Sequence, residues 1–344
     1  MEGQRLNSTS KRDNQSTNKE SSASFFFYLL EYQELEKPNR KMIQSEQIIN
    51  SFNFARNSDV VFSEIVTVEQ FEELDIKDCI EIERNLKYVF YKLTKFEINE
   101  NNIIFCNTDT LINLFKILKK TTGLNNIKLI TNQTDTMITE YYYRQKPPCI
   151  SEWYAINADY DAHDLIPIPY GIANKYSPKN LLVNDFKSNT SEILYENMMY
   201  VNFVKNTNFK ERESLYDYFS NKDWALVEEP NLELSDYKQR LSKYKFVLCP
   251  WGNGVDTHRI WETLYSGNIP VTKKHHTFST SAELPILFVE SYSDINLELL
   301  NNFSANIDKE KINKNKLNID TWIGEMKKKE ITEKNPIYLN ETKF

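Results

Sequence analysis

A cluster of glycine, histidine, arginine and glutamate residues between positions 252 and 276 is the part of this sequence best suited to chemistry. Three of the chain's seven glycines and three of its four histidines lie in these 25 residues. The stretch begins in a loop, residues 250–256, that contains Gly252, Asn253 and Gly254 between an apolar strand pattern and a helical pattern. Such a loop can hold a phosphate, because glycine lets the backbone approach a ligand and the first N–H groups of the helix face an anion. A plain turn is the alternative explanation.

Arg259 and Glu262 follow this glycine loop on a predicted helix, Thr257–Ser266. At about 100° per residue the two side chains share one face of the helix, and apolar residues occupy the rest. An arginine can bind a diphosphate through two parallel donors, and a carboxylate can accept hydrogen bonds from both hydroxyls of a ribose. An ordinary surface ion pair between the two is the alternative.

Four more residues are candidates for the same site. His258 could donate a hydrogen bond to a phosphate, whereas Asp256 is expected to cap the helix. Asp109 and Asp135 each follow a predicted strand in the first half of the chain, where the carboxyl edge of a parallel sheet would face a cleft. Either of these two carboxylates could be the general base of a reaction.

We expect no metal site and no cofactor. His163 lies near Asp159, Asp161 and Asp164, but this group has one histidine and no glycine that would shape a ligand loop. The doubled histidine at 275–276 is expected to lie in a solvated, lysine-rich loop.

Strand and helix patterns alternate along both halves of the chain, which predicts two parallel-sheet domains. The predicted segments are the strand around residues 103–107, helix Leu111–Lys120, strands Ile127–Thr131, Leu165–Ile168 and Met199–Val204, helix Phe209–Phe219, strand Trp224–Val227, helix Tyr237–Tyr244, strand Phe246–Cys249, helix Thr257–Ser266 and strand Ile269–Thr272. The corresponding division is a disordered arm at 1–22, a first domain at 23–168, a second domain at 169–300 and a helical tail at 301–344. Segment Pro167–Ala173 is the expected linker and hinge.

The overall composition argues against several classes of protein. A formal charge of −7 disfavours a general nucleic-acid binder, and four widely spaced cysteines without a CxxC pair suit reduced thiols in a cytoplasmic protein. The apolar run Phe25–Leu30 is too short for a signal-peptide core or a membrane span. A stripe at Ile319, Trp322, Ile323 and Met326 in the basic tail is expected to dock on the body of the protein, with peripheral membrane contact as the alternative.

The string from Lys245 to Val271, KFVLCPWGNGVDTHRIWETLYSGNIPV, resembles the C-terminal signature of exostosin-like glycosyltransferases of the GT-B type across about 27 residues. Weaker similarities occur at LITNQTD, IPIPYGIANKYSP and NFVKNTNFKERESLYDYF. The resemblance implies an α/β fold of two Rossmann-like domains facing across a cleft, with 23–168 as the acceptor-side domain and 169–300 as the nucleotide-sugar-binding domain. It also implies that Arg259 contacts the donor diphosphate, Glu262 the ribose, and the glycine loop the donor through its backbone. Family members often have His-Asn-Ser-Asp where this chain has Asn132–Asp135, so the resemblance leaves the catalytic base open.

The sequence therefore predicts a metal-independent glycosyltransferase. It would move a sugar from a nucleoside diphosphate sugar, preferably a UDP-sugar, to a hydroxyl of a glycan or lipid-linked acceptor, as in surface polysaccharide or glycan synthesis. Two alternatives remain open: a non-catalytic nucleotide or glycan binding protein, and a fucosyltransferase-like enzyme that uses a GDP-sugar.

Overall fold

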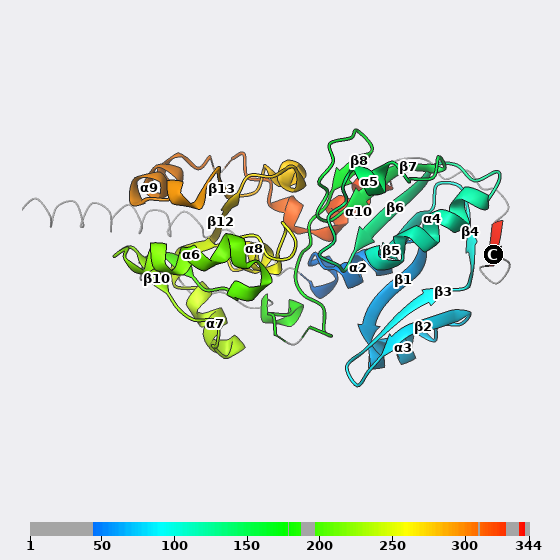
Figure 1. Cartoon of the computed structure of the whole chain (residues 1–344), viewed down its shortest axis with the longest axis horizontal. Helices are drawn as coiled ribbons and strands as arrows, with labels where there is room; N and C mark the ends of the chain where they lie inside the picture. The colour runs from blue at the N-terminus through cyan, green and yellow to red at the C-terminus, as the bar shows by residue number, and fades with distance from the viewer. Residues whose placement is uncertain (1–43, 178, 187–196, 309, 328–336, 341–344) are drawn as a thin grey trace, which may run out of the picture. The chain divides into compact units, whose positions relative to one another are not determined.

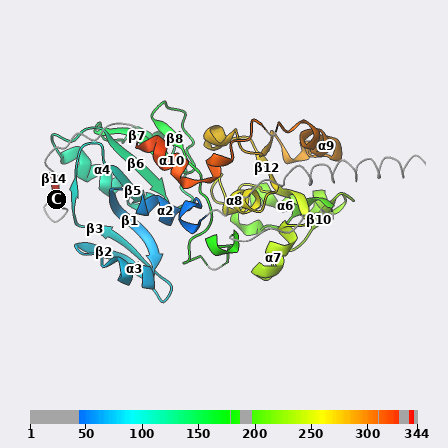
Figure 2. The same cartoon turned by 180° about the vertical axis from the view of Figure 1, so that it is seen from behind.

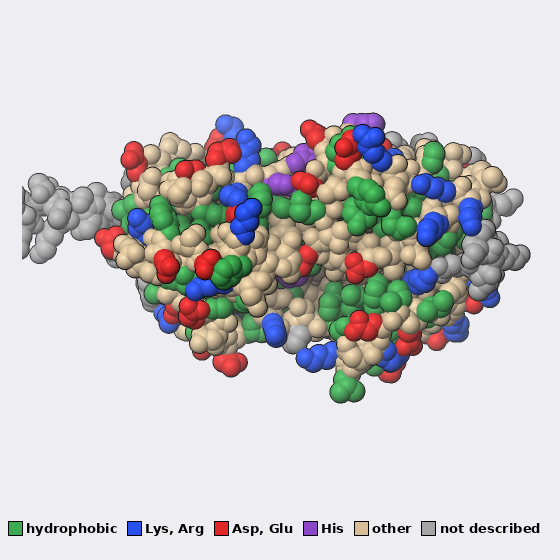
Figure 3. Space-filling model, viewed as in Figure 1, with side chains coloured by type: hydrophobic (Ala, Val, Ile, Leu, Met, Phe, Trp, Pro, Cys, Tyr) green, Lys and Arg blue, Asp and Glu red, His purple; other side chains and the backbone are tan. Residues whose placement is uncertain are grey.

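The computed structural model describes residues 44–340 except residues 178, 187–196, 309 and 328–336. The predicted disordered arm at 1–22 and the apolar run Phe25–Leu30 lie outside the described residues. The described residues form an α/β structure with two larger sheets and one two-stranded pair (Figure 1). Acidic and basic side chains are interspersed on the face shown in Figure 3, which fits the modest net charge of −7.

The first sheet has seven strands in the order β2-β3-β1-β5-β6-β7-β8. Their bounds are β1 Val60–Thr67, β2 Cys79–Arg84, β3 Tyr88–Leu93, β5 Ile103–Asn107, β6 Ile127–Asn132, β7 Ile150–Ala155 and β8 Leu165–Pro167. Strands β1, β5, β6, β7 and β8 pair in parallel, whereas β3 pairs antiparallel with both β1 and β2. A wholly parallel first sheet is therefore wrong. Residues 85–87 between β2 and β3 are too few for a parallel crossover, so these strands form a hairpin.

Short helices surround this sheet. They are α2 Ser51–Arg56, α3 Val68–Leu74, α4 Leu111–Lys120 and α5 Glu140–Tyr143. The predicted bounds of α4 are confirmed. Its apolar face is buried, including Leu114, Phe115 and Leu118. The charges of Lys119 and Lys120 in its last turn interact favourably with the negative end of the helix dipole.

The second sheet has five parallel strands in the order β10-β9-β11-β12-β13. They are β9 Asn197–Val201, β10 Ala225–Val227, β11 Tyr244–Leu248, β12 Ile269–Lys273 and β13 Leu287–Val289. Helices α6 Phe209–Ser220 and α9 Leu297–Asn306 share one buried cluster with the sheet, and α7 Leu234–Leu241 and α8 His258–Tyr265 share another. Successive residues of β11 supply both clusters, so each pair of helices covers one face. The predicted helix Tyr237–Tyr244 ends earlier than expected because Tyr244 begins β11.

Seven 3₁₀ segments connect these elements among the described residues. They are η1 Ser45–Gln47, η2 Thr108–Thr110, η3 Val183–Phe186, η4 Lys205–Thr207, η5 His276–Ser281, η6 Tyr292–Asp294 and η7 Lys314–Leu317.

The winding of the second sheet reverses between β9 and β11. The chain leaves β9 through α6 to β10 on one side, then returns to β11 on the other side of β9. In open α/β sheets, ligands bind outside the carboxyl ends of the strands at such a reversal. The two loops that leave this point are residues 202–208, after β9, and the glycine loop, after β11.

The C-terminal part of the chain returns to the first sheet. Helix α10, Ile319–Met326, lies beside α2 (Figures 1 and 2), and strand β14, Ile337–Asn340, pairs antiparallel with β4, Lys95–Ile98. The apolar stripe of α10 is buried, so this helix docks on the body of the protein, as the sequence led us to expect. The Nζ of Lys128 on β6 donates to the carbonyl of Met326, which closes the last turn of α10.

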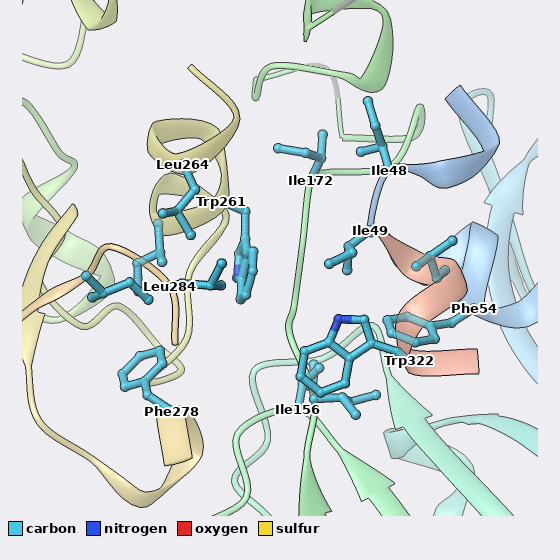
Figure 4. Close-up of a cluster of buried hydrophobic side chains, with 14 of the residues drawn as sticks. Ile48, Ile49, Phe54, Ile156, Ile172, Trp261, Leu264, Phe278, Leu284 and Trp322 are labelled. Atoms are coloured by element: carbon cyan, nitrogen blue, oxygen red, sulfur yellow. The ribbon is translucent and has the colours of Figure 1, made fainter. Parts of the chain in front are cut away.

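One buried apolar cluster joins elements from both sheets (Figure 4). It contains Phe54 of α2, Trp322 of α10, Trp261 of α8 and Ile172 of the segment after β8. The expected hinge at 167–173 is thus packed, with Ile172 fully buried and its N–H donating to the carbonyl of Ile49 at 2.8 Å. This segment is a bonded strap rather than a free linker. No helix among the described residues is long and apolar enough to cross a bilayer.

Replacement of Leu264 on α8 by alanine is expected to cost about 2–5 kcal/mol of the free energy of unfolding, because the side chain is only 5% exposed within this cluster. Leu86→Ala is the matched control, since Leu86 is 99% exposed and its loss should change stability by less than about 0.5 kcal/mol. Urea unfolding of both variants measures the difference. Equal stabilities would show that α8 does not pack through this face.

Candidate functional site

A buried arginine, Arg212 of α6, is hydrogen-bonded to the backbone of the glycine loop. Its Nε donates to the carbonyl of Trp251 at 2.7 Å and its Nη2 to that of Pro250 at 2.8 Å, while Nη1 donates to the carbonyl of Val204 at 2.7 Å and to Thr207 at 2.6 Å. The guanidinium thereby ties the loop after β9 to the loop after β11. All of these acceptors are neutral, so Arg212 keeps an uncompensated positive charge beneath the glycine loop.

Packing leaves little room for a side chain at Gly252 and none at Gly254 unless a neighbour moves. A Cβ on Gly252 would lie 3.1 Å from Nη2 of Arg212, and one on Gly254 would lie 2.7 Å from Nδ2 of Asn157. The Asn157 side chain has little freedom to retreat, because it is fully buried and its Oδ1 accepts from the N–H of Asp256 at 2.9 Å. Asn208 adds a hydrogen bond to the carbonyl of Gly252 at 3.0 Å. These contacts explain the glycines without a ligand, and the backbone contacts expected of residues 252–254 with a donor stay a prediction.

Arg259 and Glu262 are linked through a tyrosine on α7. Nη1 of Arg259 donates to the Tyr237 hydroxyl at 2.8 Å, and that hydroxyl donates to Oε2 of Glu262 at 2.9 Å. The other carboxylate oxygen, Oε1, accepts from the N–H of Leu181 at 3.2 Å. Glu262 is only 3% exposed, so the surface ion pair considered from the sequence is wrong. Its contact with a ribose stays a prediction, and it would require the carboxylate to exchange or share its present partners.

The two arginines of the site influence each other. Burial and the neighbouring charge of Arg259 lower the pKa of Arg212 to about 10. Against the effect of burial, Tyr237 and Glu262 raise the pKa of Arg259 and so stabilise its charge. Arg212 lacks such support from its hydrogen bonds, because the groups to which it is bonded are neutral. Two cations, Arg212 and Arg259, thus lie close to the loop, with the carboxylates of Glu262 beside Arg259 and of Asp135 at Asn253.

The sequence led us to expect that Asp256 caps α8, and the structure shows that it does not. Thr257 is the N-cap residue, and Asp256 is buried one position earlier. Its carboxylate accepts from the backbone N–H of Tyr170 at 2.8 Å and from Nε1 of Trp261 at 2.9 Å. Burial nevertheless raises its pKa to about 7. The folded state thus binds this proton more tightly than the unfolded chain does, and the stability from that difference is full at low pH and falls as pH rises towards 7.

His258, the first residue of α8, is fixed against the strap. Its Nδ1 lies 2.7 Å from the carbonyl oxygen of Gly171, and its ring stacks on that of Tyr170 with centroids 4.2 Å apart and planes at 22°. Burial lowers the pKa of His258, although the charges of Glu262 and Asp135 oppose the shift. The imidazole is consequently neutral near pH 7, and its predicted contact with a phosphate would have to come from the neutral ring.

Of the two candidate bases, Asp135 is the one that the fold brings to the glycine loop. Its Oδ2 accepts from Nδ2 of Asn253 at 3.2 Å, although the two residues are 118 positions apart. Asp109 is the middle residue of η2, where its N–H donates to Oδ1 of Asn107 at 3.0 Å, and partial burial raises its pKa. The described residues show no contact between Asp109 and the loop. The role of either carboxylate as a base stays a prediction.

The histidine pair at 275–276 is not in a solvated loop. Nε2 of His275 lies 3.0 Å from Oδ1 of Asp159, its ring makes a T-shaped contact with that of Trp251, and Nε2 of His276 is buried. The prediction of a solvated loop is wrong because His275 and Thr277 pack against residues 158–159, which follow β7. His163 is 93% exposed, and the described residues contain no group of three metal-ligating side chains.

A shallow depression of about 380 Å³ lies between α6 and residues 290–293, next to Lys273. Its lining does not include the glycine loop. The candidate site, formed by the loop and its charged neighbours, is therefore separate from this depression.

Sequence reasoning missed Arg212, Asn157, Tyr170 and Tyr237. Arg212 did leave a signal, because it falls on the apolar face of α6 with Leu215, Tyr216 and Phe219, where an exposed arginine would not be expected. The other three read as loop or packing residues, since their partners lie far away in the sequence.

Arg212→Lys is expected to cost on the order of 3 kcal/mol of unfolding free energy, because one ammonium nitrogen cannot take the place of the three separate guanidinium nitrogens that reach the carbonyls of Val204, Pro250 and Trp251. Arg240→Lys is the control, since Arg240 makes only a partly exposed pair with Glu228 and should cost less than about 1 kcal/mol. Chemical denaturation measures both. Wild-type stability of Arg212→Lys would contradict this role.

Gly254→Ala is expected to destabilise the protein by about 1–3 kcal/mol, because its Cβ would overlap the confined Asn157 side chain. Gly324→Ala should instead stabilise it by about 0.5–1 kcal/mol, since Gly324 lies within α10 and a Cβ there meets no atom within 4 Å. The two thermal melts should shift in opposite directions. Two shifts of the same sign would refute the packing explanation for Gly254.

Part of the chain is similar to a known protein family. Residues 183–337, a little under half of the chain, match the family model described as the RXYLT1 C-terminal domain, an exostosin-like xylosyltransferase family. No curated protein matches the chain. The matched segment includes Arg212, the glycine loop and α8. The match supports a glycosyltransferase family for this part of the chain, in agreement with the resemblance noted in the sequence.

Proposed function

We propose that this protein is a glycosyltransferase that binds a nucleoside diphosphate sugar at the glycine loop and transfers the sugar to an acceptor hydroxyl. The observation that carries the proposal is the position of this loop. It follows β11 at the reversal of a parallel sheet, it leads into the N-terminus of α8, and it lies within the segment that matches a glycosyltransferase family.

The charges around the loop suit a diphosphate. Arg259 shares its hydrogen bond with an uncharged tyrosine hydroxyl, and Arg212 is bonded only to neutral oxygens. The N–H groups at the start of α8 add partial positive charge. Negative charge that grows on the leaving diphosphate would be stabilised most by this fixed arrangement, since the donors need no reorganisation during the reaction. We propose that these groups serve in place of a metal ion.

The first sheet would supply the acceptor side of the reaction. Asp135 follows β6 at the carboxyl edge of that sheet and reaches Asn253 of the glycine loop. We propose the GT-B arrangement on this basis, supported by two sheets that each contain parallel strands and by the return of α10 to the first sheet. The family description makes xylose the first sugar to test, carried as UDP-xylose.

We expect UDP to bind the wild-type protein and Arg259→Gln to weaken that binding about ten- to a hundredfold, because hydrogen bonds to a charged group contribute roughly 1.5–3 kcal/mol. Isothermal titration calorimetry measures the affinity. Arg240→Gln is the control, since Arg240 lies on α7 and pairs with Glu228. Release of UDP from UDP-xylose would separate an enzyme from a passive binder. If UDP and GDP both fail to bind the wild type, the proposed function is wrong.

A further inference from the structure

The hydrogen bond between His258 and Gly171 fixes which ring nitrogen carries the proton. A backbone carbonyl can only accept, so Nδ1, at 2.7 Å from the oxygen of Gly171, must donate. In a neutral imidazole the other nitrogen, Nε2, then carries a lone pair. No group in the described part of the chain is hydrogen-bonded to Nε2. His258 therefore presents an acceptor at the start of α8.

The carbonyl that selects this tautomer is itself held in place. Gly171 has a φ of 76°, and a Cβ at this position would lie 2.1 Å from the carbonyl oxygen of Ile49. On either side, the N–H of Tyr170 donates to Asp256 and that of Ile172 donates to Ile49. Because the ring of Tyr170 also stacks on the imidazole, both the plane and the tautomer of His258 are set before any ligand arrives.

The groups around the imidazole decide its charge. Asp135 from the loop after β6 and Glu262 from α8 favour the imidazolium, whereas burial disfavours it. The positive end of α8 also opposes a charge on its first residue. Tyr170 stays protonated, because burial raises its pKa well above the ordinary value. The ring is thus a neutral acceptor, with carboxylates near enough to stabilise the positive charge that it would gain with a proton.

We propose that Nε2 of His258 is the base that takes the proton of the acceptor hydroxyl, a role that rests on the proposed glycosyl transfer. The O–H bond breaks and its proton moves to Nε2, while the hydroxyl oxygen bonds to the anomeric carbon. The bond from that carbon to the diphosphate breaks, and its electron pair leaves with the diphosphate. The resulting imidazolium, stabilised by Asp135, returns its proton to water. His258 then accepts a proton from a hydroxyl instead of donating to a phosphate.

The tautomer can be tested without any substrate. Long-range proton–nitrogen NMR of the histidine-labelled full chain reports which ring nitrogen carries the proton, and His258→Asn identifies the signal of His258. We expect the proton on Nδ1, with a titration midpoint below the ordinary pKa of about 6.5. A proton on Nε2 near neutral pH would overturn the proposal, as would a midpoint above the ordinary value.

The kinetic test uses the same variant, because an asparagine amide can keep the hydrogen bond to Gly171 while Nε2 is lost. We expect UDP affinity within about twofold of the wild type. We also expect a loss of about 10²–10⁴ in kcat/KM for UDP release from UDP-xylose, with the acid limb of the pH profile removed. His163→Asn is the matched control, since its side chain is 93% exposed and should leave both quantities unchanged.

Three outcomes distinguish the explanations. If His258→Asn retains wild-type activity and its acid limb, the histidine is not the base. If Asp135→Asn alone removes that limb, the carboxylate is the base and the proposal for His258 is wrong. If the wild type binds no nucleotide and releases no UDP, the glycosyltransferase function fails together with the catalytic role, even where NMR finds the expected tautomer.

Discussion

The buried carboxylate of Asp256 is the interaction on which the arrangement of this site depends. It accepts hydrogen bonds from the backbone of Tyr170 and from the indole of Trp261, while its own N–H is bonded to Asn157. Three segments thus meet at one residue: the turn after β7 at its backbone, and the strap after β8 and helix α8 at its carboxylate. Burial raises the pKa of this carboxyl to about 7, so its donors only partly offset the cost of removing a charge from water. A residue kept at such a cost has a positional role.

That position determines the geometry of the glycine loop on both sides. Asp256 and Asn157 hold the end that leads into α8, and Arg212 holds the carbonyls at the beginning. The loop is therefore shaped by the protein alone, before a ligand contributes anything. The strap is fixed by the same contacts, so any closing motion has to break the Tyr170–Asp256 bond or move α8 together with the first sheet.

The sequence predicts those elements whose own residues determine them. Helix α4 follows from its strong apolar periodicity, whereas the periodicity of α6 is weaker and its start is marked by the Asn208 cap. The β2–β3 hairpin is not predicted, although isoleucine and glutamate alternate over residues 80–83 as in a strand, because the turn at 85–87 contains no glycine to mark it. In the site, Arg259 and the glycine loop could be found because their spacing is local. Asp256 could not be understood, since its partners Tyr170 and Asn157 lie 86 and 99 residues away.

The contacts also change what the glycines and the charged pair mean. Gly252 and Gly254 are explained by the side chains that lie against them, so their presence alone does not indicate a phosphate site. The case for an anion rests instead on charge. Arg212 is surrounded by neutral acceptors, and burial together with the charge of Arg259 lowers its pKa to about 10, whereas Tyr237 and Glu262 raise the pKa of Arg259 against the effect of burial. A diphosphate bound near the two arginines would offset the unfavourable burial of the Arg212 charge. Part of its binding energy would therefore come from a cost that the folded protein already carries.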